Sequence, residues 1–119
     1  MSTANYAELT SPRIDPDGVL RFHEGDTFVF PLEIHISDGD TPITIGQDDV
    51  ITVEFFTENI KRKLASVVFE NVENNTVTVE FDKEFSGLFR PKRVIDAGYT
   101  FEVRYNDKLI ANDGRIEVL

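Results

Sequence analysis

The segment that decides the fold is Tyr99-Thr100-Phe101-Glu102-Val103-Arg104-Tyr105. Its aromatic and apolar side chains occupy every second position, with polar side chains between them. Because a strand points successive side chains to opposite faces, this pattern predicts a β-strand with one buried face and one wet face. Asn106-Asp107 follows where a tight turn would reverse the chain, and a second alternation closes the sequence at residues 114–118. We therefore expect a closing antiparallel hairpin.

Similar alternation predicts further strands upstream. Residues 28–36 read as a long strand, in which Pro31 cannot donate a ladder hydrogen bond and so implies a bulge or an open edge. Residues 50–56 are apolar on both faces, which is typical of a central strand covered on two sides. Shorter strands are expected at residues 19–22, 43–45, 64–69 and 76–81, with Asn74-Asn75 as a hairpin turn that sets Val67 and Phe69 opposite Val77, Val79 and Phe81.

About seven to eight short strands with frequent turn signals predict an all-β fold, an antiparallel β-sandwich. A small barrel is the alternative, because strand count does not separate the two. Residues 1–13 read as a flexible N-terminal arm and residues 14–119 as one sandwich domain, with one helical turn in a crossover at residues 82–95. The expected core is Phe28, Phe30, Leu32, Ile34, Val53, Phe55, Val67, Phe69, Val77, Val79, Phe101, Val103, Ile116 and Val118.

Composition excludes several function classes. The sequence has no cysteine, which rules out disulfides, a thiolate nucleophile and Cys-ligated metal. Its net charge of −10 argues against nucleic acid as a partner. The N-terminus lacks the basic start and apolar run of a signal peptide, and no stretch is long and apolar enough to cross a membrane. We expect a protein made in the cytoplasm and released in soluble form.

Motifs for catalysis and cofactors are lacking in the sequence. It contains no nucleophile elbow, phosphate-binding glycine loop or His-Glu-x-x-His helix, so we expect no enzyme, no cofactor and no catalytic residue. His23 and His35 are too few for a zinc site and are interpreted as surface histidines, with a carboxylate-assisted site as the alternative. Four acidic turns are interpreted as turn chemistry, with calcium binding as the alternative. They lie at residues 15–18, 38–40, 47–49 and 112–114.

Candidate interface residues come from two basic clusters and two aromatic side chains. The clusters are Lys61-Arg62-Lys63 and Arg90 with Lys92-Arg93. They read either as solvated turns that protect strand edges or as a contact patch for an acidic partner surface. Phe56, opposite in face to Phe55, and Tyr6 in the arm are candidate exposed aromatics, which could bind sugars or anchor a protein interface. The alternative is that loops partly cover the outer face of the central strand.

Several segments, taken in order over residues 19–119, carry a family resemblance. They are Glu24-Gly25-Asp26 leading into the long strand, the turn and short apolar piece at residues 38–45, the strand at residues 50–55, Ala97-Gly98-Tyr99-Thr100-Phe101 and Gly114-Arg115-Ile116-Glu117-Val118. In this the chain resembles the small immunoglobulin-like domains of phage tail and baseplate proteins, such as the N-terminal domain of the baseplate upper protein.

The resemblance implies a virion-associated or prophage structural component that acts through protein–protein contacts. Self-association fits such a role, because open sheet edges can add strands from a neighbour. The alternatives are a carbohydrate-binding module that uses exposed aromatics and acidic loops, and an inactive remnant of an extracellular adhesin.

Overall fold

The computed structural model describes residues 6–91 and 98–119. These residues form two facing β-sheets, so the predicted all-β sandwich is confirmed over the small barrel. The elements in chain order are β1 (Tyr6–Thr10), β2 (Val19–Phe22), β3 (Phe28–Asp38), β4 (Thr41–Ile43), β5 (Ile51–Thr57), β6 (Lys63–Phe69), β7 (Thr76–Phe81), α1 (Lys83–Ser86), β8 (Tyr99–Tyr105) and β9 (Lys108–Val118).

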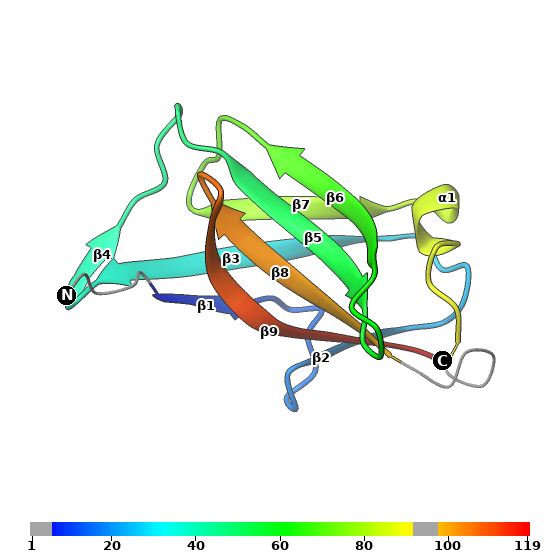
Figure 1. Ribbon diagram of the computed structural model, residues 1–119. Coiled ribbons are helices and arrows are strands. Elements are labelled where there is room, and N and C mark those ends of the chain that lie inside the picture. Colours follow the sequence, from blue (N-terminus) through cyan, green and yellow to red (C-terminus); the bar gives the residue numbers. More distant parts are fainter. Residues whose placement is uncertain (1–5, 92–97) are drawn as a thin grey trace.

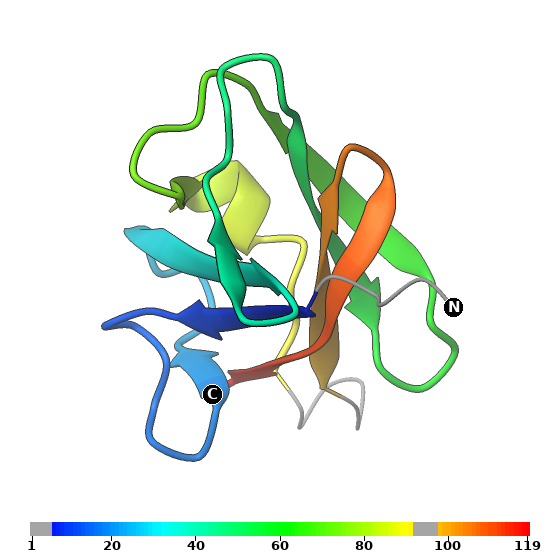
Figure 2. The same ribbon diagram turned by 90° about the vertical axis from the view of Figure 1, so that its left-hand side faces the viewer.

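The two sheets differ in construction. In the four-stranded sheet, β3 lies at the centre and pairs with β1, β4 and β7. The five-stranded sheet has the order β2-β9-β8-β5-β6, in which β2 runs parallel to β9 and the other neighbours are antiparallel. Figure 1 shows the five-stranded sheet in front of the other, and Figure 2 shows the two layers from the side.

Aromatic side chains fill the space between the sheets. Phe81 lies at the centre of this cluster, with ring centroids 4.5 Å from Phe28 and 4.8 Å from Phe85. The predicted core is confirmed except that Phe28, Val67 and Phe69 are half-buried. Further core members that the predicted core left out are Leu20, Phe22, Ile36, Ile45, Ile51, Val72, Phe81, Phe89, Tyr99, Ile110 and Ala111.

The long strand β3 shows the predicted alternation and explains Pro31. The Ile34 N–H donates to the Asn75 carbonyl at 2.8 Å, so the even-numbered residues of β3 turn their backbone groups toward the β7 side. Pro31 therefore faces the other side, where β1 pairs only with residues 33–37. Its missing N–H costs no ladder hydrogen bond, and the prediction of an open edge at this point is confirmed.

The predicted hairpin between β6 and β7 is wrong. Instead, β6 pairs with β5 in one sheet and β7 pairs with β3 in the other, so Val67 does not lie opposite Val79. Asn74 and Asn75 do make a tight reversal, both with positive φ, but it closes only the short bridge between Glu73 and Thr76. Turn chemistry marks where a chain reverses, and it leaves open which strands then pair.

The Asn75 side chain joins three segments at the end of the four-stranded sheet. Its amide nitrogen donates to the carbonyls of Ile34 at 3.2 Å and Ile43 at 3.0 Å, and its oxygen accepts from the Ile45 N–H at 2.9 Å. These bonds hold β4 and the chain after it against β3. The short edge strand expected at residues 43–45 is found two residues earlier, as β4.

The closing hairpin is confirmed. Asn106 and Asp107 have φ values of 49° and 69°, as the two-residue hairpin turn requires. Gly114 lies inside β9 opposite Phe101, where a Cβ atom would come within 2.5 Å of the Phe101 ring. The Tyr99 hydroxyl accepts a hydrogen bond from the Arg90 N–H at 2.7 Å, which ties the crossover from β7 to the start of β8.

Two expectations concern segments outside the predicted strands, the crossover and the N-terminal arm. The helical turn in the crossover is confirmed as α1, and Asp82 caps it by accepting from the Phe85 N–H at 2.8 Å. The flexible arm at residues 1–13 is corrected, because residues 6–10 form β1 and pair with β3 in the register Tyr6↔Ser37 to Thr10↔Glu33. Residues 1–5 lie outside the described part of the chain.

Candidate interaction surface

Two carboxylates lie side by side on the outer face of the five-stranded sheet. Glu54 of β5 and Glu102 of β8 are cross-strand partners, and the residues are only 7% and 4% exposed. Like charges directly opposite one another destabilise a sheet, and burial adds a desolvation cost for each charged group. The face is stable only if cations compensate both carboxylates.

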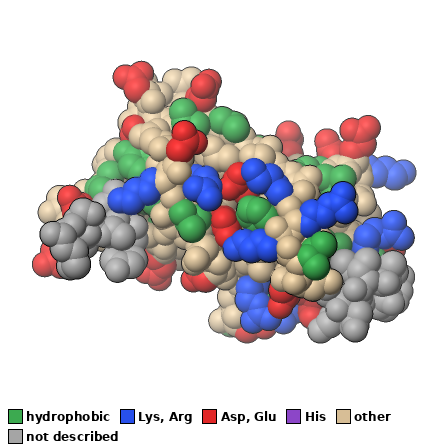
Figure 3. All heavy atoms as spheres, viewed as in Figure 1, with side chains coloured by type: hydrophobic (Ala, Val, Ile, Leu, Met, Phe, Trp, Pro, Cys, Tyr) green, Lys and Arg blue, Asp and Glu red, His purple; other side chains and the backbone are tan. Residues whose placement is uncertain are grey.

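Three basic side chains supply that compensation. Lys63 Nζ and Arg104 Nε lie 2.8 Å from the two oxygens of Glu54, and Lys61 Nζ lies 2.5 Å from Glu102 Oε2. The hydrogen bonds from Lys63 and then Arg104 lower the pKa of Glu54, and the bond to Glu54 raises the pKa of Arg104. We call these five residues the charged strip; Figure 3 shows basic and acidic side chains interleaved over the middle of this face.

Phe56 is covered by this strip. The residue is 8% exposed, and Lys61 Nζ lies 5.4 Å from the ring centroid, within the range of a cation–π contact. The expectation of an exposed aromatic at Phe56 is therefore corrected. Its ring stabilises the position of Lys61 and offers little free face to a ligand.

The predicted interface residues separate into groups. Lys61, Lys63 and Phe56 come together in or under the charged strip, and Arg62 lies on the same β5–β6 turn with its N–H bonded to Thr57 Oγ1 at 3.0 Å. Arg90 lies elsewhere, with Nε 3.7 Å from a carboxylate oxygen of Glu24.

Three of the predicted residues are only partly described or not described. Lys92 and Arg93 lie outside the described residues. The backbone of Tyr6 pairs with Ser37 at the start of β1, but its side chain is outside the described part.

Sequence reasoning missed the acidic half of the strip. The alternation of β8 predicts that Glu102 and Arg104 lie on its wet face, whereas Glu102 is buried, and it assigns no role to Glu54. A signal was present, because Glu54 is a charged residue in a segment that is otherwise mainly apolar. What the sequence lacked was the register of β5 against β8, which makes Glu54 and Glu102 neighbours.

Exposed apolar side chains flank the charged strip. Ile60, on the β5–β6 turn, is 71% exposed, and Val68, on the outer face of β6, is 59% exposed. An apolar centre with a polar rim is the usual anatomy of a protein-binding surface.

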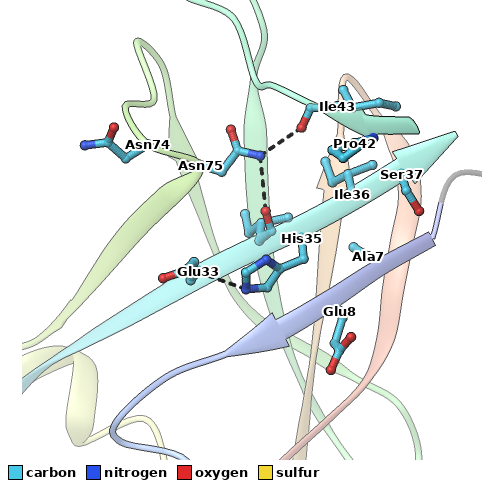
Figure 4. Close-up of a pocket in the computed structure, with 11 residues that line it drawn as sticks. Ala7, Glu8, Glu33, His35, Ile36, Ser37, Pro42, Ile43, Asn74 and Asn75 are labelled. Carbon is cyan, nitrogen blue, oxygen red and sulfur yellow. Dashed lines mark hydrogen bonds and ion pairs between the residues drawn. The ribbon is translucent and has the colours of Figure 1, made fainter. Parts of the chain in front are cut away.

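The outer surface of the four-stranded sheet carries His35. Its Nε2 lies 3.0 Å from Glu33 and 3.1 Å from the Thr10 hydroxyl, beside an open depression of about 430 Å³ between β1, β3 and β4. Figure 4 shows His35 and Glu33 on one side of this depression and Asn75 on the other. His23 lies in an exposed turn. In the described residues, no three His, Asp or Glu side chains gather as a metal site.

Two of the four predicted acidic turns, at residues 15–18 and 47–49, have structural partners, whereas residues 112–114 lie inside β9 and form no turn. Arg21 binds Asp17 at 2.7 Å, Glu117 at 2.8 Å and Asp15 at 3.0 Å, and the bond from Arg21 lowers the pKa of Asp17. In the turn before β5, Asp49 accepts from the side chains of Asn106 and Tyr105 and from the backbone of Gly46, and these bonds, Asn106 first, lower its pKa.

Two comparisons of the sequence with known proteins found no match. No protein-family model matches the chain, and no curated protein sequence matches it. Within the described residues, no helix has the length and apolar character needed to span a bilayer.

Proposed function

We propose that this chain is a non-enzymatic structural module of a phage or prophage tail or baseplate, with an immunoglobulin-like sandwich that acts through protein–protein contacts. The observation that carries the proposal is the outer face of the five-stranded sheet. There the charged strip lies beside the exposed side chains of Ile60 and Val68.

The strip is suited to binding because its charges are already ordered. Glu54 and Glu102 are fixed by cations from β6, β8 and the β5–β6 turn, so little side-chain freedom remains to be lost when a partner binds. Arg62 projects from the same turn, and arginine is enriched at protein interfaces. The resemblance of residues 19–119 to phage tail and baseplate domains supports the particle-associated role.

Co-expression with the products of the genes that flank its own tests this proposal. We expect tail, tape-measure or portal genes among these neighbours, and a stoichiometric complex between the chain and one of their products. The complex should weaken at least tenfold on Ile60→Asp and be unaffected by Val29→Asp, a matched change at an exposed valine on the other sheet. A chain that binds none of the neighbouring products contradicts the proposal.

Carbohydrate binding is the competing function, and a glycan array distinguishes it. Phe56 is the aromatic on which it depended among the described side chains, and its 8% exposure leaves little ring surface for stacking on a sugar. We expect that no glycan on the array binds through the Phe56 ring, so Phe56→Leu should abolish no glycan binding. Saturable glycan binding that this substitution removes would contradict the assembly role.

A further inference from the structure

We infer that the free edge of β6 is a homodimer interface, at which β6 pairs antiparallel with β6 of a second copy of this chain. The inference deepens the proposed assembly function and rests on it, since it names one contact through which the module would assemble. Strand addition at a sheet edge gives affinity through backbone hydrogen bonds.

β6 has one unused edge. Among the strands that the structure describes, β6 is the last of the five-stranded sheet and pairs only with β5. The Thr57 N–H donates to the Arg62 carbonyl and the Asn106 N–H donates to the Val50 carbonyl, each at 2.9 Å. Odd-numbered residues of β5 therefore face β6, and even-numbered residues face β8.

This alternation of odd-numbered and even-numbered residues identifies which backbone groups of β6 face outward. The register Phe55↔Ala65 and Ile51↔Phe69 turns the backbone groups of the odd-numbered residues of β6 toward β5. The N–H and carbonyl groups of Ser66 and Val68 consequently point away from the sheet, toward any added strand. Both residues are exposed.

The usual protections of an edge strand are missing from this segment. Natural edges are blunted by charges, prolines, bulges or short length. The run Ala65-Ser66-Val67-Val68-Phe69 contains no charge, proline or glycine, and its bulge lies earlier, where the β5 register shifts between Phe55 and Phe56. By contrast, β2 is four residues long and carries Arg21, and β4 contains Pro42.

Charge complementarity indicates a second copy as the occupant. Exposed Lys61, Arg62 and Lys63 lie where β6 begins, and exposed Glu70 and Glu73 follow its end. A two-fold axis that pairs the strands antiparallel brings the basic start of each copy to the acidic end of the other. Elsewhere two chains of net charge −10 repel one another, so this edge is a favoured place of contact.

A register centred on Ser66 overlaps the full length of the two strands. It sets Ser66 opposite Ser66 of the other copy and brings Arg62 beside Glu70. Because Lys61 and Lys63 are already bound to Glu102 and Glu54, we assign the intermolecular ion pair to Arg62. One added strand buries less than the roughly 800 Å² per partner of a stable complex, so the dimer forms only at high concentration.

Sedimentation velocity of the full chain from about 5 to 500 µM tests the dimer. We expect the mass to rise toward twofold with concentration. Ser66→Pro removes an outward N–H without touching the β5 ladder and should raise the dissociation constant at least tenfold. Thr78→Pro is the matched control. Odd-numbered residues of β7 turn their backbone groups toward β3, so the Thr78 N–H faces the open edge of β7. This variant should leave the dimer unchanged.

A charge exchange keeps the test decisive if a proline variant fails to fold. Arg62→Glu and Glu70→Arg should each weaken the dimer severalfold, and the double variant should restore it. A chain that stays monomeric, a dimer insensitive to Ser66→Pro, or a double variant without rescue overturns the inference. A monomer that still binds a flanking gene product overturns the dimer alone, whereas a dimer that binds none overturns the wider function alone.

Discussion

The two ends of the five-stranded sheet are built in opposite ways. At one end, β2 is short and buried, and its polar residue Arg21 is held by three carboxylates. At the other end, β6 is longer, only half-buried and free of charge between Ala65 and Phe69. The difference teaches that burial and ion pairing close one edge of this sandwich, while the other keeps its backbone groups available for pairing.

The largest expected effect compares the phenylalanines of the two end strands. Phe22 of β2 is 2% exposed and contacts the rings of Phe28, Phe81 and Phe89, so Phe22→Ala should lower the free energy of unfolding by about 3–5 kcal/mol. Phe69→Ala, at the half-buried β6 end, should cost only about 1–2 kcal/mol. Urea denaturation measures both, and equal losses would remove the contrast between the ends.

The next effect concerns Gly114 in β9, the strand that pairs with β2. Gly114→Ala places a methyl group against the buried Phe101 ring, and we expect a loss of about 1–3 kcal/mol in unfolding free energy. Gly46→Ala is the control, since its added Cβ atom meets only the Asp49 side chain and should change stability by less than about 0.5 kcal/mol. If thermal melts show Gly114→Ala to be neutral, the close packing of β9 on β8 is refuted.

A substitution in the charged strip should cause a smaller loss of stability, and this loss should depend on pH. Glu54→Gln should lower stability by about 1–2 kcal/mol at pH 7, because Lys63 and Arg104 lose a charged partner. The folded-state pKa of Glu54 is lowered, so its contribution is present above the unfolded-state pKa of about 4.3 and is lost as pH falls through the folded-state value. The gap between wild type and variant should therefore close in acid.

Urea titrations at neutral and acidic pH measure that gap. Glu80→Gln, an exposed change on β7, should leave stability within about 0.5 kcal/mol of wild type at every pH. A Glu54→Gln deficit that persists unchanged in acid would show that the ion pairs of the strip do not stabilise the fold.

The smallest effect is expected at the ion pairs of Arg21. Asp17 and Arg21 are substantially exposed, so solvent and salt screen their attraction. Asp17→Asn should lower the melting temperature slightly in low salt, and the difference should vanish in molar salt. A melting difference that is independent of salt would mean that Asp17 acts through its bond to the Val19 N–H instead.

Local signals in the sequence predicted much of the fold. The β8–β9 hairpin was predictable because alternation and its turn residues lie within one contiguous segment. The partner of β6 was not, because Asn74 and Asn75 mark a reversal without specifying which strands pair. β1 was missed because its ladder is completed by β3, more than twenty residues away.

The candidate surface divides in the same manner. Lys61, Lys63 and Phe56 could be nominated from their residue types. The carboxylates that hold the two lysines could not, because Glu54 and Glu102 become neighbours only through strand register. Burial of Phe56 likewise depends on where the turn after β5 places Lys61.

Amide hydrogen exchange in dilute and concentrated solution tests most directly the claim that the β6 edge pairs with itself. Exchange at Ser66 and Val68, whose N–H groups face outward, should slow severalfold as concentration rises, while Thr78 and Glu80 on the open edge of β7 should not change. Equal exchange of Ser66 and Val68 at both concentrations would contradict the account.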